Sequence, residues 1–128
     1  MPIASLSTRH ARVLLVAALA LTTYLALTPL DTPILEDIND KLQHILAFVV
    51  LAWLTDEAFP TRSWSRHKCI PLFAYGLIIE LLQGAVPGRV TSLLDLGADT
   101  LGLLLYPLLR SLAARLGSTK HSDTNQSP

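Results

Sequence analysis

The sequence predicts an all-α polytopic membrane protein, folded as a bundle of four transmembrane helices. Of its 128 residues, 51% are hydrophobic and only 16% are charged, against roughly 25% charged residues in soluble domains. Four apolar stretches approach the roughly 20 residues that a helix needs to cross a hydrocarbon core of about 30 Å. Prolines and cap residues separate these stretches, which makes each of them a helix of its own.

The four predicted spans cover residues 13–28, 41–59, 70–86 and 93–112. A proline follows each of the first three spans, at Pro29, Pro60 and Pro87. Pro71 lies in the first turn of the third span, where proline is tolerated, and Ser92 is a natural cap for the fourth. Pro107 falls inside the fourth span, and we expect it to kink that helix near Leu103.

The first span has an alternative interpretation as a signal peptide, because Arg9 and Arg12 precede its apolar run. No clean small-x-small cleavage site precedes the turn at Thr28, and cleavage would leave the other three helices in the same orientation. Residues 1–117 therefore form the predicted four-helix transmembrane domain. Residues 118–128 are nearly all polar, which predicts a disordered cytoplasmic tail.

Charge and cysteine content exclude several classes of protein. Ten Lys and Arg balance ten Asp and Glu, so no excess of positive charge indicates a nucleic-acid partner. Cys69 is the only cysteine, so an intramolecular disulfide is impossible and the cysteine spacing of a structural zinc site is absent. Metal-ligand residue types occur without a diagnostic spacing such as H-E-x-x-H, and we expect neither a metal nor a cofactor.

The distribution of Lys and Arg predicts the orientation of the helices. One side would carry Arg9, Arg12, Arg62, Arg66, Lys68, Arg110, Arg115 and Lys120. The other side would carry only Lys41 and Arg89. The richer side should be cytoplasmic, which places both termini and the loop at residues 60–68 in the cytoplasm of a cell whose inner or plasma membrane holds the chain. The loops at residues 31–39 and 87–92 should face outward.

Polar residues gather at the predicted outer ends of three helices. They are Asp40, Lys41, His44, Glu80, Gln83, Arg89, Asp95 and Asp99. These eight residues form the candidate binding site, and we expect no comparable cluster at the inner ends. Helical spacing also puts glycines beside the acids, in the stripes Gly76, Glu80, Gln83, Gly84 and Asp95, Asp99, Gly102, Tyr106. Such stripes should face other helices rather than lipid.

Glu80 is the least ordinary member of this group because it lies about 9 Å below Val86, inside the predicted apolar layer. An unpaired charge there costs several kcal/mol. We expect Glu80 to pair with Arg89, with Lys41 as the alternative, or to pair with protonated His44 or take up a proton itself.

The other polar residues also have simpler interpretations. Asp40 and Asp95 suit the first turns of helices, where they stabilise the helix dipole, and Ser92 with Asp95 resembles a capping box. Lys41 suits an interface position from which its amine reaches water. Trp53, Trp64 and Tyr106 are typical interface or packing aromatics.

Four segments carry a resemblance to the VanZ-like family of small bacterial integral membrane proteins. They are D-K-L-Q-H at 40–44, Y-G-L-I-I-E-L-L-Q at 75–83, P-G-R at 87–89 and S-L-L-D-L-G-A-D-T-L-G at 92–102. Asp99 departs from the asparagine that the family commonly has there, which adds a negative charge. The resemblance implies the membrane class, the motif residues and a link to the cell envelope or to the response to the glycopeptide teicoplanin, but it supplies no mechanism.

The leading hypothesis is a binding protein whose outward-facing polar pocket engages a lipid headgroup, a lipid-linked envelope precursor or a partner membrane protein. Lys41 and Arg89 would bind an anionic group, and Glu80, Asp95 and Asp99 would position those cations. One alternative is a membrane enzyme that acts on a lipid-linked substrate with His44 or Glu80 as acid or base. Another is a small proton-coupled exporter that works as an oligomer.

Overall fold

The computed structural model describes residues 6–29, 38–89 and 91–122, with the side chains of 38–40 and 118–122 excepted. Four α-helices and one short π-helical segment make up this part of the chain, which contains no strand. The elements are α1 (Thr8–Leu27), α2 (Ile38–Ala58), the π-helical segment η1 (Ser65–Cys69), α3 (Ile70–Gln83) and α4 (Leu93–Ser122). The predicted all-α fold of four helices is thereby confirmed for the described residues.

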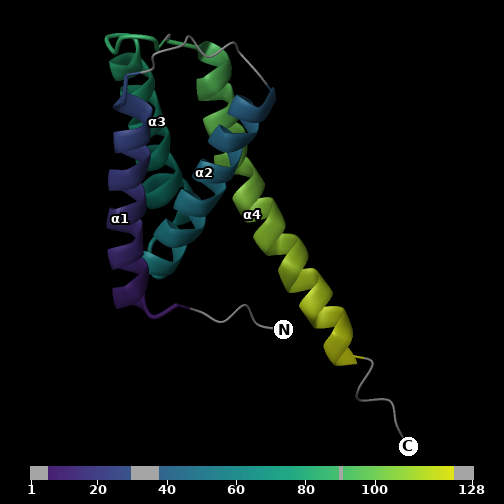
Figure 1. Ribbon diagram of the computed structural model, residues 1–128. Helices are drawn as coiled ribbons and strands as arrows, with labels where there is room; N and C mark the ends of the chain where they lie inside the picture. The colour runs from purple at the N-terminus through teal and green to yellow at the C-terminus, as the bar shows by residue number, and fades with distance from the viewer. Residues whose placement is uncertain (1–5, 30–37, 90, 123–128) are drawn as a thin grey trace, which may run out of the picture.

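The helices alternate in direction, so the start of α1 and the end of α4 lie toward the same end of the molecule (Figure 1). We call this the lower end, and the end with the α3 to α4 connection the upper end. The main packing partners of α2 are α4 and α1. Their shared core includes Leu15 of α1, Phe48 and Leu51 of α2, and Leu103 of α4. The last part of α4 extends away from the other helices.

Glycine permits a close approach between α2 and α4. A Cβ atom built on Gly102 would lie 2.6 Å from the backbone oxygen of Ile45 and 2.9 Å from Cβ of Phe48. A Cβ on Gly76 of α3 would lie 3.0 Å from the Phe48 ring. The predicted stripe of Asp95, Asp99, Gly102 and Tyr106 is buried along its whole length. It therefore faces other helices, as the spacing indicates.

The predicted boundaries fail mainly at the end of α4. This helix passes through Pro107 without interruption and reaches Ser122, beyond the predicted span end at residue 112 and five residues into the predicted disordered tail. The residues between 108 and 116 are mostly Leu, Ala and Arg, which have high helix propensity, and this explains why the helix continues past residue 112; residues 117–122 are mostly poor helix formers, and their helical state has no such explanation. Residues 123–128 lie outside the described part of the chain.

One helix among the described residues, α1, is long and apolar enough to cross a membrane by length and composition. Only 11% of its most apolar window is buried inside the molecule. By contrast, α3 has 14 residues, and α2 and α4 carry acidic residues at 56, 57, 95 and 99. By length and composition, one helix in the described part of the chain could therefore cross a membrane.

Candidate functional site

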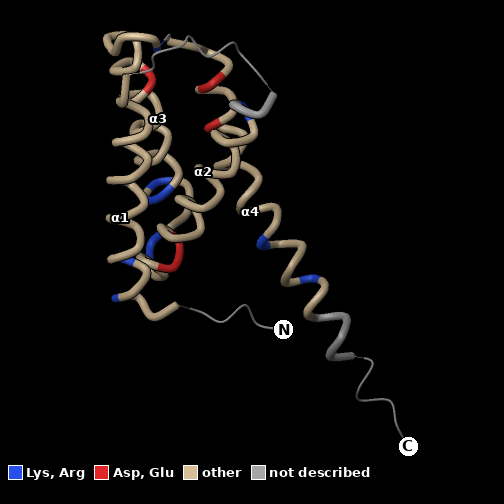
Figure 2. Tube along the Cα trace, in the orientation of Figure 1, with Lys and Arg blue, Asp and Glu red and all other residues tan. Residues whose placement is uncertain are grey.

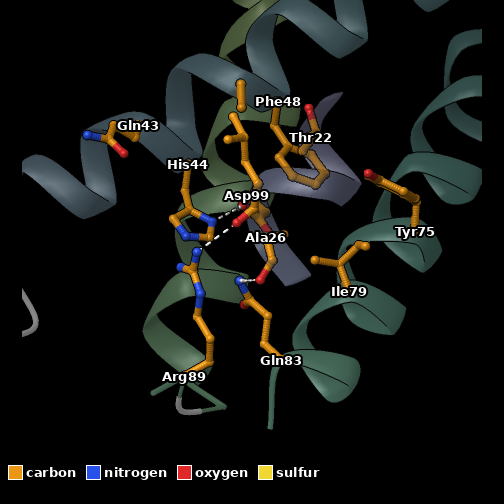
Figure 3. Close-up of a pocket in the computed structure, with 12 residues that line it drawn as sticks. Thr22, Ala26, Gln43, His44, Phe48, Tyr75, Ile79, Gln83, Arg89 and Asp99 are labelled. Carbon is orange, nitrogen blue, oxygen red and sulfur yellow. Dashed lines mark hydrogen bonds and ion pairs between the residues drawn. The ribbon is translucent and has the colours of Figure 1, made fainter. Parts of the chain in front are cut away.

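A cavity of about 230 Å³ lies among the four helices toward the upper end, where α1 ends and α4 begins (Figure 3). Side chains from α1, α2, α3 and α4 line it, together with Arg89 from the connection before α4. The lining residues are Thr22, Leu25, Ala26, Gln43, His44, Ala47, Phe48, Tyr75, Ile79, Gln83, Arg89 and Asp99. Four of the eight predicted site residues therefore reach one cavity: His44, Gln83, Arg89 and Asp99.

His44 and Asp99 form the main polar contact across the cavity wall. Nδ1 of His44 lies 2.8 Å from Oδ1 of Asp99, and Asp99 is only 3% exposed. On the other side of the ring, Nε2 of His44 lies 3.8 Å from Oδ2 of Asp95. Because Asp95 and Asp99 are one helical turn apart on α4, the two carboxylates flank the imidazole and fix its orientation.

Lys41 pairs with Asp95, and it is not among the residues that line the cavity. Ser92 accepts a hydrogen bond from the backbone N–H of Asp95, which is the predicted cap of α4. Asp40 belongs to the first turn of α2, and its side chain lies outside the described residues. Among the described residues, no group of three or more His, Cys, Asp or Glu side chains is arranged to hold a metal ion.

Arg89 contacts the end of α1. Its Nη2 group donates to the carbonyl oxygen of Leu25 at 2.6 Å, and its Nε group donates to that of Thr28 at 3.2 Å. Gln83 donates to the next carbonyl along, that of Ala26, at 3.1 Å. The last carbonyls of a helix lack partners within the helix, and these two side chains supply them. Figure 3 shows the Arg89 guanidinium also pointing toward His44 and Asp99.

Glu80 is 2% exposed and does not line the cavity. Its Oε1 atom accepts a hydrogen bond of 2.6 Å from the backbone N–H of Ser92, and its Oε2 atom is buried with no hydrogen-bond partner in the described part of the chain. The predicted pair of Glu80 with Arg89, or with Lys41, is therefore wrong. The turn containing Gly88, whose φ is 78°, places Arg89 against the end of α1. Lys41 forms its ion pair with Asp95.

A second charged cluster lies at the opposite end, where the sequence analysis expected none. Asp56 of α2 accepts hydrogen bonds from Lys68 of η1 at 2.5 Å, and from Tyr106 and Arg110 of α4 at 2.6 Å each. Asp56 is 7% exposed and Lys68 is 2% exposed. Figure 2 shows acidic residues at both ends of the bundle accordingly. The expectation of no comparable inner cluster is wrong.

Sequence reasoning missed the members of this cluster because they come from three separate elements. One signal was present, since Asp56 falls inside the predicted apolar span at 41–59 and needs a partner there. Sequence reasoning also missed the aromatic residue Tyr75 in the cavity wall. Tyr75 of the matched Y-G segment lines the cavity, and its hydroxyl lies 2.7 Å from Oγ1 of Thr23 on α1.

Comparison with known proteins identifies the family of the chain. No curated protein and no solved structure matches it. The model of the VanZ/LLP1 family matches residues 3–113. This range contains all of α1, α2, η1 and α3, the cavity lining and both charged clusters. The match extends over most of the chain, and the chain belongs to the VanZ/LLP1 family.

Proposed function

We propose that the four helices span a membrane, with both termini in the cytoplasm and the cavity in the outer leaflet. Large apolar side chains on every helix support this placement, since Val16 of α1, Leu46 of α2, Leu81 of α3 and Leu104 of α4 are each more than half exposed. So much exposed apolar surface is unusual for a monomeric soluble protein. The distribution of Lys and Arg supports the orientation.

In this membrane the protein binds the anionic headgroup of a lipid or a lipid-linked envelope precursor. The observation that carries the proposal is the composition of the cavity wall. Arg89, His44 and Gln83 contribute polar groups, and Asp99 contributes a carboxylate that is paired with His44. Phe48 and Ile79 contribute apolar surface. A wall of this kind fits a molecule with a charged head and an apolar tail.

Arg89 is the cation that binds the anionic group. Two of its five N–H groups hold carbonyls of α1, which fixes a planar guanidinium at the cavity. His44, oriented by Asp99, adds a second nitrogen group. Lys41 acts indirectly, by holding Asp95 beside His44, and it does not itself bind the anionic group.

Lipid-resolved mass spectrometry of the gently purified protein tests this function. We expect one anionic headgroup class to co-purify with the wild type and to fall at least several-fold in Arg89→Gln and in His44→Gln. Arg62→Gln is the matched control, because it removes the same charge at an exposed loop position. Lipid retention by folded Arg89→Gln and His44→Gln equal to that of Arg62→Gln and the wild type would contradict the proposal.

The pair of His44 and Asp99 favours one second candidate, an enzyme that acts on a lipid-linked substrate. A carboxylate that holds one ring nitrogen prepares the imidazole for acid or base work at the other. Glu80 lies outside the cavity lining, so this candidate rests on His44. Turnover of defined lipid-linked substrates by the wild type, lost in His44→Gln but not in Glu80→Gln, would favour the enzyme over the binding protein.

A further inference from the structure

The cavity among the four helices is open on the side of α1 and α2. Two of its lining residues are exposed, Leu25 of α1 and Gln43 of α2. We call the opening beside these two residues the mouth. On the opposite wall, Ile79 of α3 and Asp99 of α4 are buried. A ligand therefore enters between α1 and α2, and α3 and α4 close the far side.

Apolar surface continues from the mouth along both helices. Leu21 lies one turn from Leu25 toward the lower end of α1, and Leu46 lies nearly one turn from Gln43 toward the lower end of α2. Leu21 is 59% exposed and Leu46 is 63% exposed. In the proposed membrane both leucines lie deeper than the mouth. A hydrocarbon chain attached to a headgroup at the mouth can therefore stay in lipid while the headgroup enters.

The volume of the cavity limits the size of that headgroup. At about 230 Å³, the cavity is smaller than pockets for drug-sized molecules, which measure roughly 300–1,000 Å³. A single phosphate with a small substituent is smaller than such molecules, whereas a disaccharide on a pyrophosphate is not. The sugars of the larger headgroup would have to stay at the mouth, beside the apolar side chain of Leu25.

The polar groups of the wall also suit a single phosphate. Among the described lining residues, Arg89 is the one Lys or Arg and Asp99 is the one Asp or Glu. A pyrophosphate would bring more negative charge toward the Asp99 carboxylate with no second Lys or Arg in this wall to bind it. The hydroxyl of Tyr75 and the amide nitrogen of Gln83, which could otherwise bind sugar hydroxyls, both bond α1.

We propose that the cavity binds a membrane lipid whose headgroup is a single phosphate with at most a small substituent, admitted sideways through the mouth. This inference rests on the proposed function and narrows its ligands to one headgroup chemistry. A glycerophospholipid such as phosphatidylglycerol and a polyprenyl monophosphate share that chemistry. An envelope precursor that carries a disaccharide on a pyrophosphate does not.

Native mass spectrometry of the full chain in detergent tests the headgroup limit. Three lipids are added at equal concentration: phosphatidylglycerol, a polyprenyl monophosphate, and the same polyprenyl chain bearing a disaccharide pyrophosphate. We expect the monophosphate to occupy several-fold more of the protein than the disaccharide pyrophosphate, although their tails are identical. The occupancies of phosphatidylglycerol and of the polyprenyl monophosphate show which of the two sources the protein prefers.

Ala47 offers a variant that reduces the cavity. Because Ala47 lines the cavity, Ala47→Leu should lower the occupancy of the single-phosphate lipids several-fold. Ala74→Leu is the matched control, since it makes the same change at an exposed position outside the lining, and it should bind like the wild type. Thermal unfolding checks that both variants are folded. The comparison of headgroups on the wild type depends on neither variant.

Two outcomes would overturn the headgroup limit and leave the proposed function standing. One is equal occupancy of the wild type by the two polyprenyl lipids. The other is equal occupancy of folded Ala47→Leu and Ala74→Leu, which would show that the phosphate does not enter the cavity. If none of the three lipids binds the wild type, or if their binding is unchanged in Arg89→Gln, the proposed function itself fails and this inference fails with it.

Discussion

Glu80 combines deep burial with an incomplete set of hydrogen bonds. Its Oε1 atom holds the N–H of Ser92 at the start of α4, whereas Oε2 is buried without a partner in the described part of the chain. A carboxylate in an apolar layer costs several kcal/mol unless it is compensated. A protonated acid avoids most of that cost and still accepts the hydrogen bond from Ser92, so a neutral side chain at position 80 fits these surroundings better than a charged one.

The separate partners of Glu80 and Arg89 make their substitutions independent. We expect Glu80→Gln to unfold within about 1 kcal/mol of the wild type, because glutamine resembles the neutral acid and keeps an acceptor for Ser92. Arg89→Gln should lower the free energy of unfolding by more, because two carbonyls at the end of α1 lose their hydrogen-bond donor. The two losses should add in the double variant, since the residues share no hydrogen-bond partner. Thermal unfolding in detergent measures the stability of both single variants and of the double variant. A coupling energy above about 1 kcal/mol would indicate that Glu80 and Arg89 interact directly.

Asp99→Asn tests charge at nearly constant volume. Asparagine keeps an oxygen that can face Nδ1 of His44, so the variant should fold to a similar yield. It removes the negative charge that stabilises a protonated imidazole, so lipid retention should fall while unfolding stays within about 1 kcal/mol of the wild type. Asp99→Ala is the disruptive comparison. Loss of folded Asp99→Asn protein would mean that the charge, rather than the hydrogen bond, holds α2 to α4.

For single residues, the sequence predicted where a side chain lies in the bundle better than it predicted which group that side chain bonds. The order of the predicted spans placed His44 and Asp99 at the same end of the bundle, and depth singled out Glu80 as lying inside the apolar layer. Partners were harder to predict, because a side chain of Arg or Lys reaches several acceptors and the nearest ones are often backbone carbonyls. Arg89 illustrates this, since the carbonyls at the end of α1 compete with every carboxylate.

Among the helices, the cluster around Asp56 ties α2, η1 and α4 together at the lower end. Asp56→Asn leaves the almost fully buried Lys68 without its countercharge. Breaking such a pair costs about 3–5 kcal/mol. We expect a comparable loss of unfolding free energy, and Glu57→Gln, the neighbouring acid, should change it by less than about 0.5 kcal/mol. Adding Lys68→Met to Asp56→Asn should recover part of the loss; no recovery would show that the charge of Lys68 is not the cause.

Two glycines of α4 provide an internal comparison. Gly102→Ala places a Cβ against the backbone of Ile45, so α2 and α4 must separate, and we expect a loss of about 1–3 kcal/mol in unfolding free energy. Gly97→Ala places its Cβ in open space, so higher helix propensity should stabilise the protein by up to about 1 kcal/mol. Chemical denaturation of both variants measures the contrast. Equal effects would mean that the close approach at Gly102 is not needed for packing.

The helices themselves followed from apolar length and from proline positions, and three of the four predicted spans match the observed helices to within about five residues. The end of α4 was not predicted, because apolar length ended the predicted span at residue 112 and polarity after residue 117 indicated disorder, whereas the Leu, Ala and Arg residues at 112–116 favour a helix. η1 had no signal in the sequence. A π-helical turn depends on tertiary contacts such as that of Lys68 with Asp56.

For the whole molecule, the proposed orientation predicts which introduced cysteines a membrane-impermeant reagent can reach. Starting from Cys69→Ser, a cysteine at Gly88 or Thr91 should react from outside intact cells, whereas one at Arg62 or Ser65 should react only after permeabilisation. The reason is that the side of the membrane on which positions 62 and 65 lie carries more Lys and Arg, which is typical of the cytoplasmic side. Efficient labelling of position 62 in intact cells would invert the molecule and place the cavity in the cytoplasmic leaflet.

The short α3 has a consequence for the bilayer around the protein. Its 14 residues measure about 21 Å, and the apolar part of its neighbour α1, residues 13–27, measures about 22 Å. In the proposed placement both are shorter than the hydrocarbon core of about 30 Å, which is a hydrophobic mismatch. Lipids beside α3 would thin to meet it, and their headgroups would descend toward Gln83 and the cavity. Acyl-chain length, as well as headgroup charge, would then set how closely a lipid approaches the site.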